Sequence, residues 1–160
     1  MIDKSAYMLR ISQASPVGLV VINFELILEF LNEATAATDD REAFRTAIGK
    51  AKDGLEQLIQ ALDFDVAVSH DFYEIYNFCY KLLSEAIFSS DMEAACSAVK
   101  NVAEFMETLL EGWRVAEEKN LSDVPEDSTD SPRVYAGLTY GRDGSANEYI
   151  DENKDRGFMA

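Results

Sequence analysis

The chain has 160 residues, of which 48% are apolar, and it carries 30 acidic side chains against 14 basic ones. This length allows one domain with one sizeable core, and the apolar content excludes wholesale disorder. The net charge of -16 at pH 7 disfavours nucleic acid and anionic membrane surfaces as partners, because their phosphates would be repelled.

The first residues show no basic patch followed by an apolar stretch, so we expect no secretory signal. The apolar run from Leu19 to Ile22 is interrupted by Asn23 and Glu25, which is far short of a membrane span. These features predict a cytosolic protein without membrane insertion.

The first helix of the predicted fold begins at Ser15, because serine is a good N-cap and Pro16 suits the first helical position. It ends near Ala37 and Thr38, and it carries two apolar stripes where an ordinary surface helix has one. Such a helix is central in its bundle or keeps one face for a partner. Val20, Phe24, Ile27 and Leu31 mark one stripe, and Leu19, Ile22, Leu26 and Phe30 mark the other.

The second predicted helix runs from about Asp40 to Leu62. Gly49 and Gly54 weaken it by about 1 kcal/mol each relative to alanine, and we expect them to mark close helix approach. Its inward side chains are Phe44, Ile48, Ala51, Leu55, Leu58, Ile59 and Leu62.

The third predicted helix covers about Asp71 to Phe88, with Ser69 or Asp71 as its N-cap. Its inward side chains follow helical spacing: Phe72, Ile75, Tyr76, Cys79, Leu82, Leu83 and Ala86.

The fourth predicted helix follows a turn that ends in the capping residue Asp91 and continues to about Lys119. Four helices joined by short connections pack as antiparallel neighbours. The sequence therefore predicts that residues 15–119 form an all-α, antiparallel up-down four-helix bundle. The inward side chains of the fourth helix are Ala95, Val99, Val102, Met106, Leu109, Leu110 and Trp113.

The composition changes after Lys119. Residues 120–160 begin as an acidic linker and continue with aromatic residues among glycines and charges, without helical or strand periodicity. We expect an irregular tail.

Catalytic, metal and cofactor signatures are not found in the sequence. His70 is the single histidine, so the Glu-x-x-His pairs of a di-iron bundle cannot be assembled. Cys79 and Cys96 form no Cys-x-x-Cys pair, and both fit as small buried hydrophobes. We expect no enzyme activity, no cofactor and no metal site.

An ordered set of short motifs runs over about residues 6 to 115. Its members are Ala14-Ser15-Pro16, Ile48 with Lys50-Ala51, Leu55 through Leu62-Asp63, Ile75-Tyr76 with Phe78, Leu83, Ala86 and Asp91, and Val99, Leu109 and Trp113. Each motif is weak alone, but in order and spacing the set resembles the flagellar secretion chaperone FliS family.

The resemblance implies a chaperone of the bacterial cytosol that binds the C-terminal region of flagellin. Such a chaperone prevents premature polymerisation and supports flagellar type III export, with export-apparatus components as further partners. In this family client helices lie in hydrophobic surface grooves, and the N-terminal segment covers one groove.

By the same resemblance, residues 1–14 form the cover segment, with Tyr7, Leu9 and Ile11 as its apolar residues. Leu26 stands where the family often has glycine, which adds bulk to the groove. We also expect the tail to mimic a client segment through Tyr135, Leu138, Tyr140 and Tyr149. The groove itself is expected from residues of the first two helices: Leu19, Ile22, Leu26, Leu55, Leu58, Ile59 and Leu62.

The surplus apolar residues of the first helix leave a second hypothesis open. A helical signalling or regulatory module could dimerise through this helix and have no flagellin client.

Overall fold

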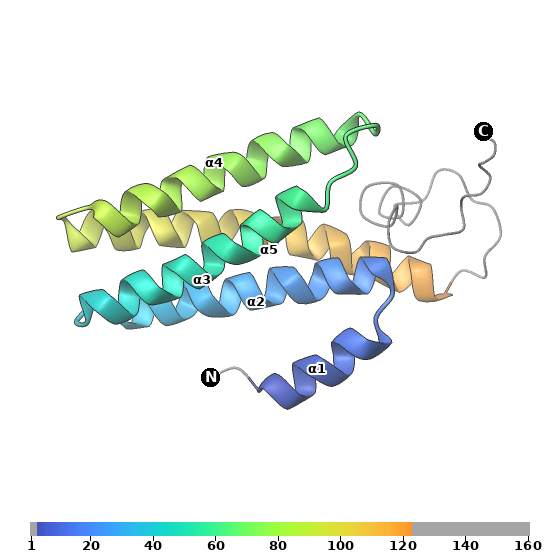
Figure 1. The fold of residues 1–160 in the computed structure, drawn as a ribbon, viewed down its shortest axis with the longest axis horizontal. Helices are drawn as coiled ribbons and strands as arrows, with labels where there is room; N and C mark the ends of the chain where they lie inside the picture. Colours follow the sequence, from blue (N-terminus) through green and yellow to red (C-terminus); the bar gives the residue numbers. More distant parts are fainter. Residues whose placement is uncertain (1–2, 123–160) are drawn as a thin grey trace.

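The computed structural model describes residues 3–122, which fold into helices without a strand (Figure 1). The predicted all-α fold is therefore confirmed for this part of the chain. Of the predicted irregular tail of residues 120–160, the first three residues continue the last helix instead, and the rest, with its four proposed anchors, lies outside the described residues. The helices are α1 (Lys4–Gln13), α2 (Pro16–Ala36), α3 (Arg41–Gln60), α4 (Val68–Phe88) and α5 (Met92–Ser122).

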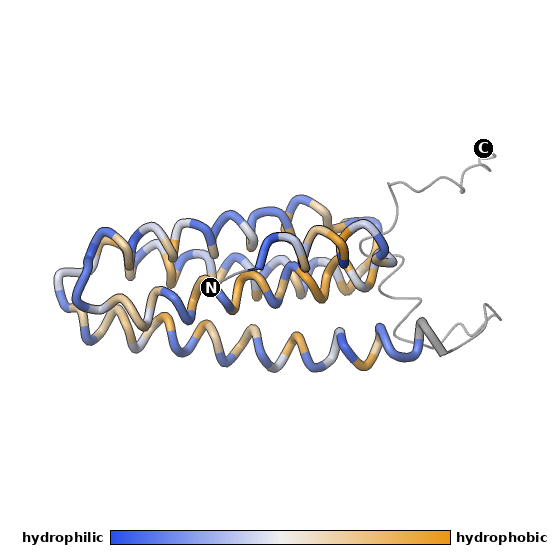
Figure 2. Tube along the Cα trace, turned by 90° about the horizontal axis from the view of Figure 1, so that it is seen from below, coloured by the Kyte–Doolittle hydropathy of each residue, from blue (hydrophilic) through white to orange (hydrophobic). Residues whose placement is uncertain are grey.

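The helices α2 to α5 pack side by side around a common core. α2 lies against α3 and α5, and α4 lies against the same two helices. Successive helices run in opposite directions, with the α2–α3 and α4–α5 turns at one end (Figure 1). Figure 2 shows hydrophobic and hydrophilic residues alternating along the helices, as amphipathic packing requires. α1 lies outside this arrangement, alongside α2.

Side-chain caps start three of the helices where the sequence predicts. The Ser15 hydroxyl accepts a hydrogen bond of 3.1 Å from the Gly18 N–H, and the Asp40 carboxylate accepts one of 3.1 Å from the Ala43 N–H. Asp91 likewise accepts from the Glu93 N–H at 3.1 Å. These oxygens satisfy amides that have no partner inside the helix.

The start of α4 differs from the prediction. The helix begins at Val68, and its N-cap Ala67 makes no side-chain hydrogen bond, so neither Ser69 nor Asp71 is the cap. Instead, the Ser69 N–H donates to the Val66 carbonyl, and the His70 N–H donates to the Ala67 carbonyl. The preceding turns thus satisfy the first amides and lead directly into the helix.

The first apolar stripe of α2 is the centre of the core. Phe24, Ile27 and Leu31 are 0% exposed, and Val20 is 4% exposed. Every inward residue predicted for α3, α4 and α5 belongs to this cluster or packs against it. The predicted helical periodicity is therefore confirmed on all four bundle helices.

Aromatic rings connect α2, α4 and α5 through the core. The Phe24 ring lies 6.2 Å from the Tyr76 ring, and Tyr76 stacks on Phe72 at 5.9 Å. Phe72 in turn lies 5.6 Å from Trp113 of α5. Such pairs add about 0.5–1.5 kcal/mol each beyond the apolar area they bury.

The two glycines of α3 have different surroundings. A Cβ atom built on Gly54 would lie 2.6 Å from Ile27 Cγ1, so α2 and α3 approach closely there, as predicted. At Gly49 nothing lies within 4 Å of such an atom, so the prediction of close approach is wrong at this position. Gly49 faces away from both neighbouring helices.

The two cysteines also differ. Cys79 is buried, and burial raises the pKa of its thiol to about 11, so the thiol is protonated and unreactive at neutral pH. Cys96 is only half-buried, so the prediction of a fully buried residue holds for Cys79 alone.

None of the helices within residues 3–122 combines the length and apolar character that crossing a membrane requires.

Candidate functional site

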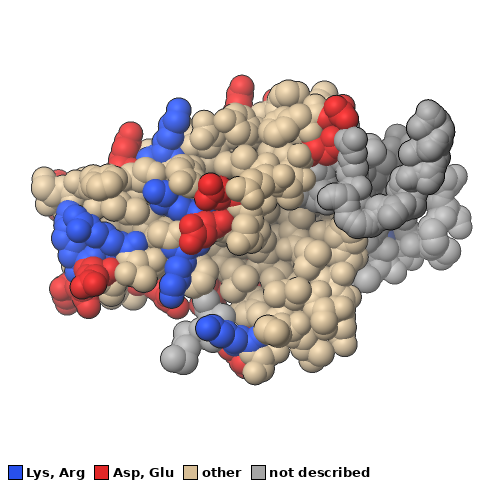
Figure 3. All heavy atoms as spheres, viewed as in Figure 1, with Lys and Arg blue, Asp and Glu red and all other residues tan. Residues whose placement is uncertain are grey.

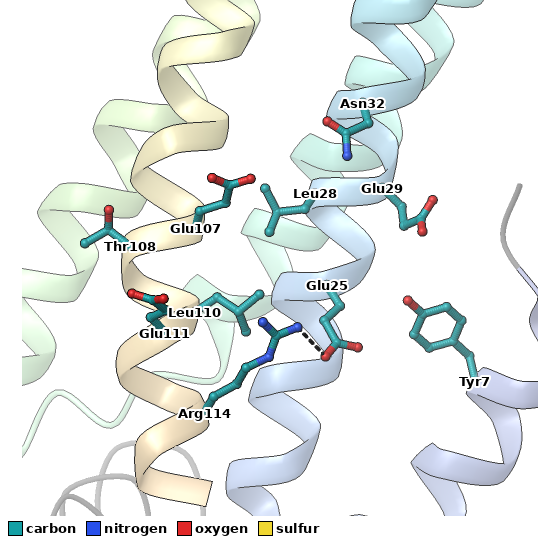
Figure 4. Close-up of a pocket in the computed structure, with 10 residues that line it drawn as sticks. All are labelled: Tyr7, Glu25, Leu28, Glu29, Asn32, Glu107, Thr108, Leu110, Glu111 and Arg114. Atoms are coloured by element: carbon teal, nitrogen blue, oxygen red, sulfur yellow. Dashed lines mark hydrogen bonds and ion pairs between the residues drawn. The ribbon is translucent and has the colours of Figure 1, made fainter.

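A groove of about 660 Å³ runs between α2 and α5, on the side of α2 that α1 flanks (Figure 4). Tyr7 is the one lining residue that comes from α1. The others are Glu25, Leu28, Glu29 and Asn32 of α2, and Glu107, Thr108, Leu110, Glu111 and Arg114 of α5.

The lining residues follow the same spacing on both helices. On α2 they start at Glu25 and end at Asn32, and on α5 they start at Glu107 and end at Arg114, with contributions at i, i+3, i+4 and i+7. This spacing places the side chains on one face of each helix. Two helix faces therefore oppose each other across the groove.

The groove is lined mainly by polar side chains and has an acidic rim; Leu28 is its half-buried apolar residue, whereas Leu110 is almost fully buried below it. Leu110 is 4% exposed, and Leu28 packs against the core from the other wall. Glu107 and Glu111 are exposed, and Glu29 is half-buried. In Figure 4 Leu28, Leu110 and Glu107 lie between α2 and α5, whereas Glu29 points to the side of α2 where Tyr7 lies.

Glu25 connects three helices at one end of the groove. Its Oε1 atom pairs with Arg10 Nη1 of α1 at 2.7 Å, and its Oε2 atom pairs with Arg114 Nη2 of α5 at 3.0 Å. Burial raises the pKa of this carboxyl, but the hydrogen bonds and charges of the two arginines outweigh burial and leave the pKa below its usual value. Glu25 is therefore ionised at neutral pH.

Tyr7 lies at the edge of the groove and is the one half-buried residue of α1. Burial, together with the charges of Glu25 and Glu29, raises the pKa of its phenol. The Arg10 guanidinium lies 5.4 Å from the centre of the Tyr7 ring. Tyr7 and Arg10 are three residues apart, so they share the face of α1 that meets α2.

The other predicted cover residues point largely to solvent. Leu9 is 60% exposed and Ile11 is 44% exposed, and the neighbouring Met8 is 69% exposed. α1 therefore rests on α2 through Tyr7 and Arg10, and the expected apolar seal by Leu9 and Ile11 is not formed. Ile11 is four residues from Tyr7 and lies on the same side of α1, so its exposure reflects the sparse packing of α1, which has α2 as its main neighbour.

The second stripe of α2 lies at the edge of the main core: Phe30 packs against the core cluster, whereas the other three residues are not part of it. Leu19 is 44% exposed, and Ile22 is buried without belonging to the core cluster. Leu26 is half-buried and also lies outside that cluster. Their predicted role in binding a partner stays a prediction.

The predicted residues of α3 occupy the core instead of a groove wall. Leu55 and Leu58 are 0% and 2% exposed, and Leu62, just after the helix, is 8% exposed. Ile59 packs against the same cluster. In this conformation Leu55, Leu58 and Leu62 offer little surface to a partner, because they fill the space between α3 and its neighbours, whereas Ile59 is half-buried. Their predicted role in binding a partner stays a prediction.

The groove between α2 and α5 is therefore a different one from that predicted, which was assigned to the first two bundle helices. Of the predicted site residues, only Tyr7 lines it. The signal that could have found it is the repeated i, i+3, i+4, i+7 set from Glu25 and again from Glu107. Those sets are mostly polar, and a search for apolar stripes passes over them.

The family model described as Flagellar protein FliS matches residues 4–120. The match covers more than half of the chain and spans α1 through nearly all of α5. No curated protein matches the chain.

Proposed function

Since the chain belongs to the flagellar protein FliS family, we propose that it is a cytosolic export chaperone for flagellin. It binds the C-terminal region of flagellin, prevents premature polymerisation and supports delivery to the flagellar type III export apparatus. The observation that carries this proposal is the family match over residues 4–120.

The surface of the bundle is consistent with holding a helical client. Helix-in-groove recognition uses side chains at i, i+3, i+4 and i+7, and the two walls of the α2–α5 groove repeat this spacing. Each Leu-, Ile- or Phe-sized client anchor that is fully buried contributes about 1.5–3 kcal/mol. Ordering the client offsets about 2–5 kcal/mol. Several anchors would therefore give reversible binding.

The N-terminal helix is suited to a displaceable cover. No residue of α1 is fully buried, and its ion pair to Glu25 involves an Arg10 side chain that is 46% exposed. Exposed ion pairs of this kind contribute about 1 kcal/mol or less. Movement of α1 would free the edge of the groove that Tyr7 lines, and we propose that Leu19, Ile22 and Leu26 on α2 also contact the client.

The direct test is co-elution of the purified chain with the C-terminal segment of flagellin, followed by analytical ultracentrifugation. We expect a monomer that forms a one-to-one complex. A concentration-dependent dimer that ignores the flagellin segment would instead support the dimerising regulatory module.

A further inference from the structure

The rim of the α2–α5 groove holds carboxylates that the folded chain leaves unpaired. Glu29, Glu107 and Glu111 line the groove, and within residues 3–122 none of them forms an ion pair or a side-chain hydrogen bond. Arg114 is the one lining cation, and it is already bound to Glu25. The groove therefore presents unbalanced negative charge around the half-buried Leu28.

The cations on the opposite side of the bundle have partners. Lys50 lies 5.6 Å from the Phe30 ring, and Lys52 lies 4.7 Å from the Tyr80 ring. Arg41 and Arg45 donate to the carbonyls of Ser89 and Ile87. In Figure 3, where α3 lies in front, Lys and Arg side chains gather toward the end with the α2–α3 turn. These cations lie away from the groove carboxylates.

One edge of the groove is already in contact with a helix of the same chain, α1. α1 presents an aromatic ring and a guanidinium three residues apart, and Arg10 reaches Glu25 at 2.7 Å. This contact shows that the groove edge accepts a helix that combines a cation with an apolar side chain. A client helix that carries Lys or Arg side chains could pair with the remaining carboxylates as Arg10 pairs with Glu25.

We infer that the α2–α5 groove selects a basic amphipathic helix of the client. An apolar side chain of that helix packs onto the half-buried Leu28, and flanking Lys or Arg side chains pair with Glu29, Glu107 and Glu111. This inference rests on the proposed function, since it states which chemistry the client segment must present to the groove.

The first experiment measures affinity for the flagellin C-terminal segment in the full-length chain. The groove variant carries Glu29→Gln, Glu107→Gln and Glu111→Gln. The matched control carries Glu56→Gln, Glu74→Gln and Glu85→Gln, which remove the same charge from exposed positions on α3 and α4. We expect the groove variant to bind about tenfold more weakly at low salt, since three ion pairs at the groove rim are lost. The control should stay within about twofold.

Salt dependence provides a second readout. Raising the ionic strength from about 0.01 M to 1 M shortens the Debye length from about 30 Å to 3 Å. Binding by the unmodified chain and the control should weaken over this range, whereas the groove variant should respond much less. Equal affinity and equal salt response in all three proteins would overturn the inference while leaving the proposed function intact. Equal weakening of the control would also overturn it, because net charge would then be the cause.

A pair of designed helical peptides separates the two proposals. Both carry the same apolar anchors, and one has Lys and Arg at the flanking positions where the other has Glu. We expect the basic peptide to bind and the groove variant to lose that binding, even if the flagellin segment fails to bind. Equal binding of both peptides, or of neither, would refute the inference. If the unmodified chain self-associates and the groove variant does not, the groove binds a second copy of the chain, and the inference is refuted as well.

Discussion

The adjacent helices α1 and α2 both carry apolar side chains, yet they are held in opposite ways. α2 buries nine residues, whereas α1 buries none. In α2 the residues Val20, Phe24, Ile27 and Leu31 recur at three- and four-residue intervals and share one face. In α1, Tyr7 and Ile11 are also four residues apart, yet Ile11 is 44% exposed. Helical spacing alone therefore does not bury a helix: α2 packs against both α3 and α5, whereas α1 has α2 as its main neighbour.

The consequence is that different forces hold the two helices. α2 is fixed by apolar burial, which depends little on charge, while α1 is held near the groove by Tyr7 and by the pair of Arg10 with Glu25. The following predictions test this difference.

Removing a core side chain of α2 should have the largest effect. Phe24 is 0% exposed and contacts Tyr76, so Phe24→Ala should lower the free energy of unfolding by about 3–5 kcal/mol. Leu9→Ala on α1 should change it by no more than about 0.5 kcal/mol. Guanidinium unfolding followed by circular dichroism measures both. A comparable loss for Leu9→Ala would show that α1 is part of the core.

Substituting the two glycines of α3 tests how tightly α3 packs against the buried face of α2. Gly54→Ala should lower the free energy of unfolding by about 1–3 kcal/mol, because the added methyl group would clash with Ile27. Gly49→Ala is the matched control, and it should raise stability by up to about 1 kcal/mol, since the site is open. The same unfolding measurement applies. Stabilisation by Gly54→Ala would mean that α2 and α3 can move apart at low cost.

Deleting residues 2–12 should affect binding more than folding. The bundle should stay folded, with its free energy of unfolding changed by about 1 kcal/mol or less, because α1 buries no residue. Affinity for the flagellin segment should be equal or higher, as calorimetry would measure. Unfolding of the truncated chain would instead place α1 in the core.

Acid should release α1 before it affects α2. The pKa of Glu25 is lowered in the folded chain, so the contribution of its ion pairs is complete above the ordinary value of about 4.3. That contribution is lost as the pH falls through the lowered folded pKa, and it amounts to about 1 kcal/mol or less. An NMR titration from about pH 6 to about pH 2 should show this release as a change in the amide chemical shifts of α1. In Glu25→Gln the transition should disappear; its persistence would assign α1 docking to another group.

The sequence predicted the bundle well because the relevant signals are local. Ser15, Asp40 and Asp91 cap helices through amides only two or three residues away, and inward residues recur with the period of a single helix. The start of α4 was less predictable, since turn carbonyls replaced the side-chain cap.

By itself, the sequence determined the all-α fold, the inward faces of α2 to α5 and the two stripes of α2. Only the tertiary structure decided that Leu55 and Leu58 fill the core, that Leu9 faces solvent, and that Glu25 meets both Arg10 and Arg114. Arg114 is 89 residues from Glu25 along the chain. Such contacts depend on which helix faces which neighbour, and the periodicity of one helix carries no information about that choice.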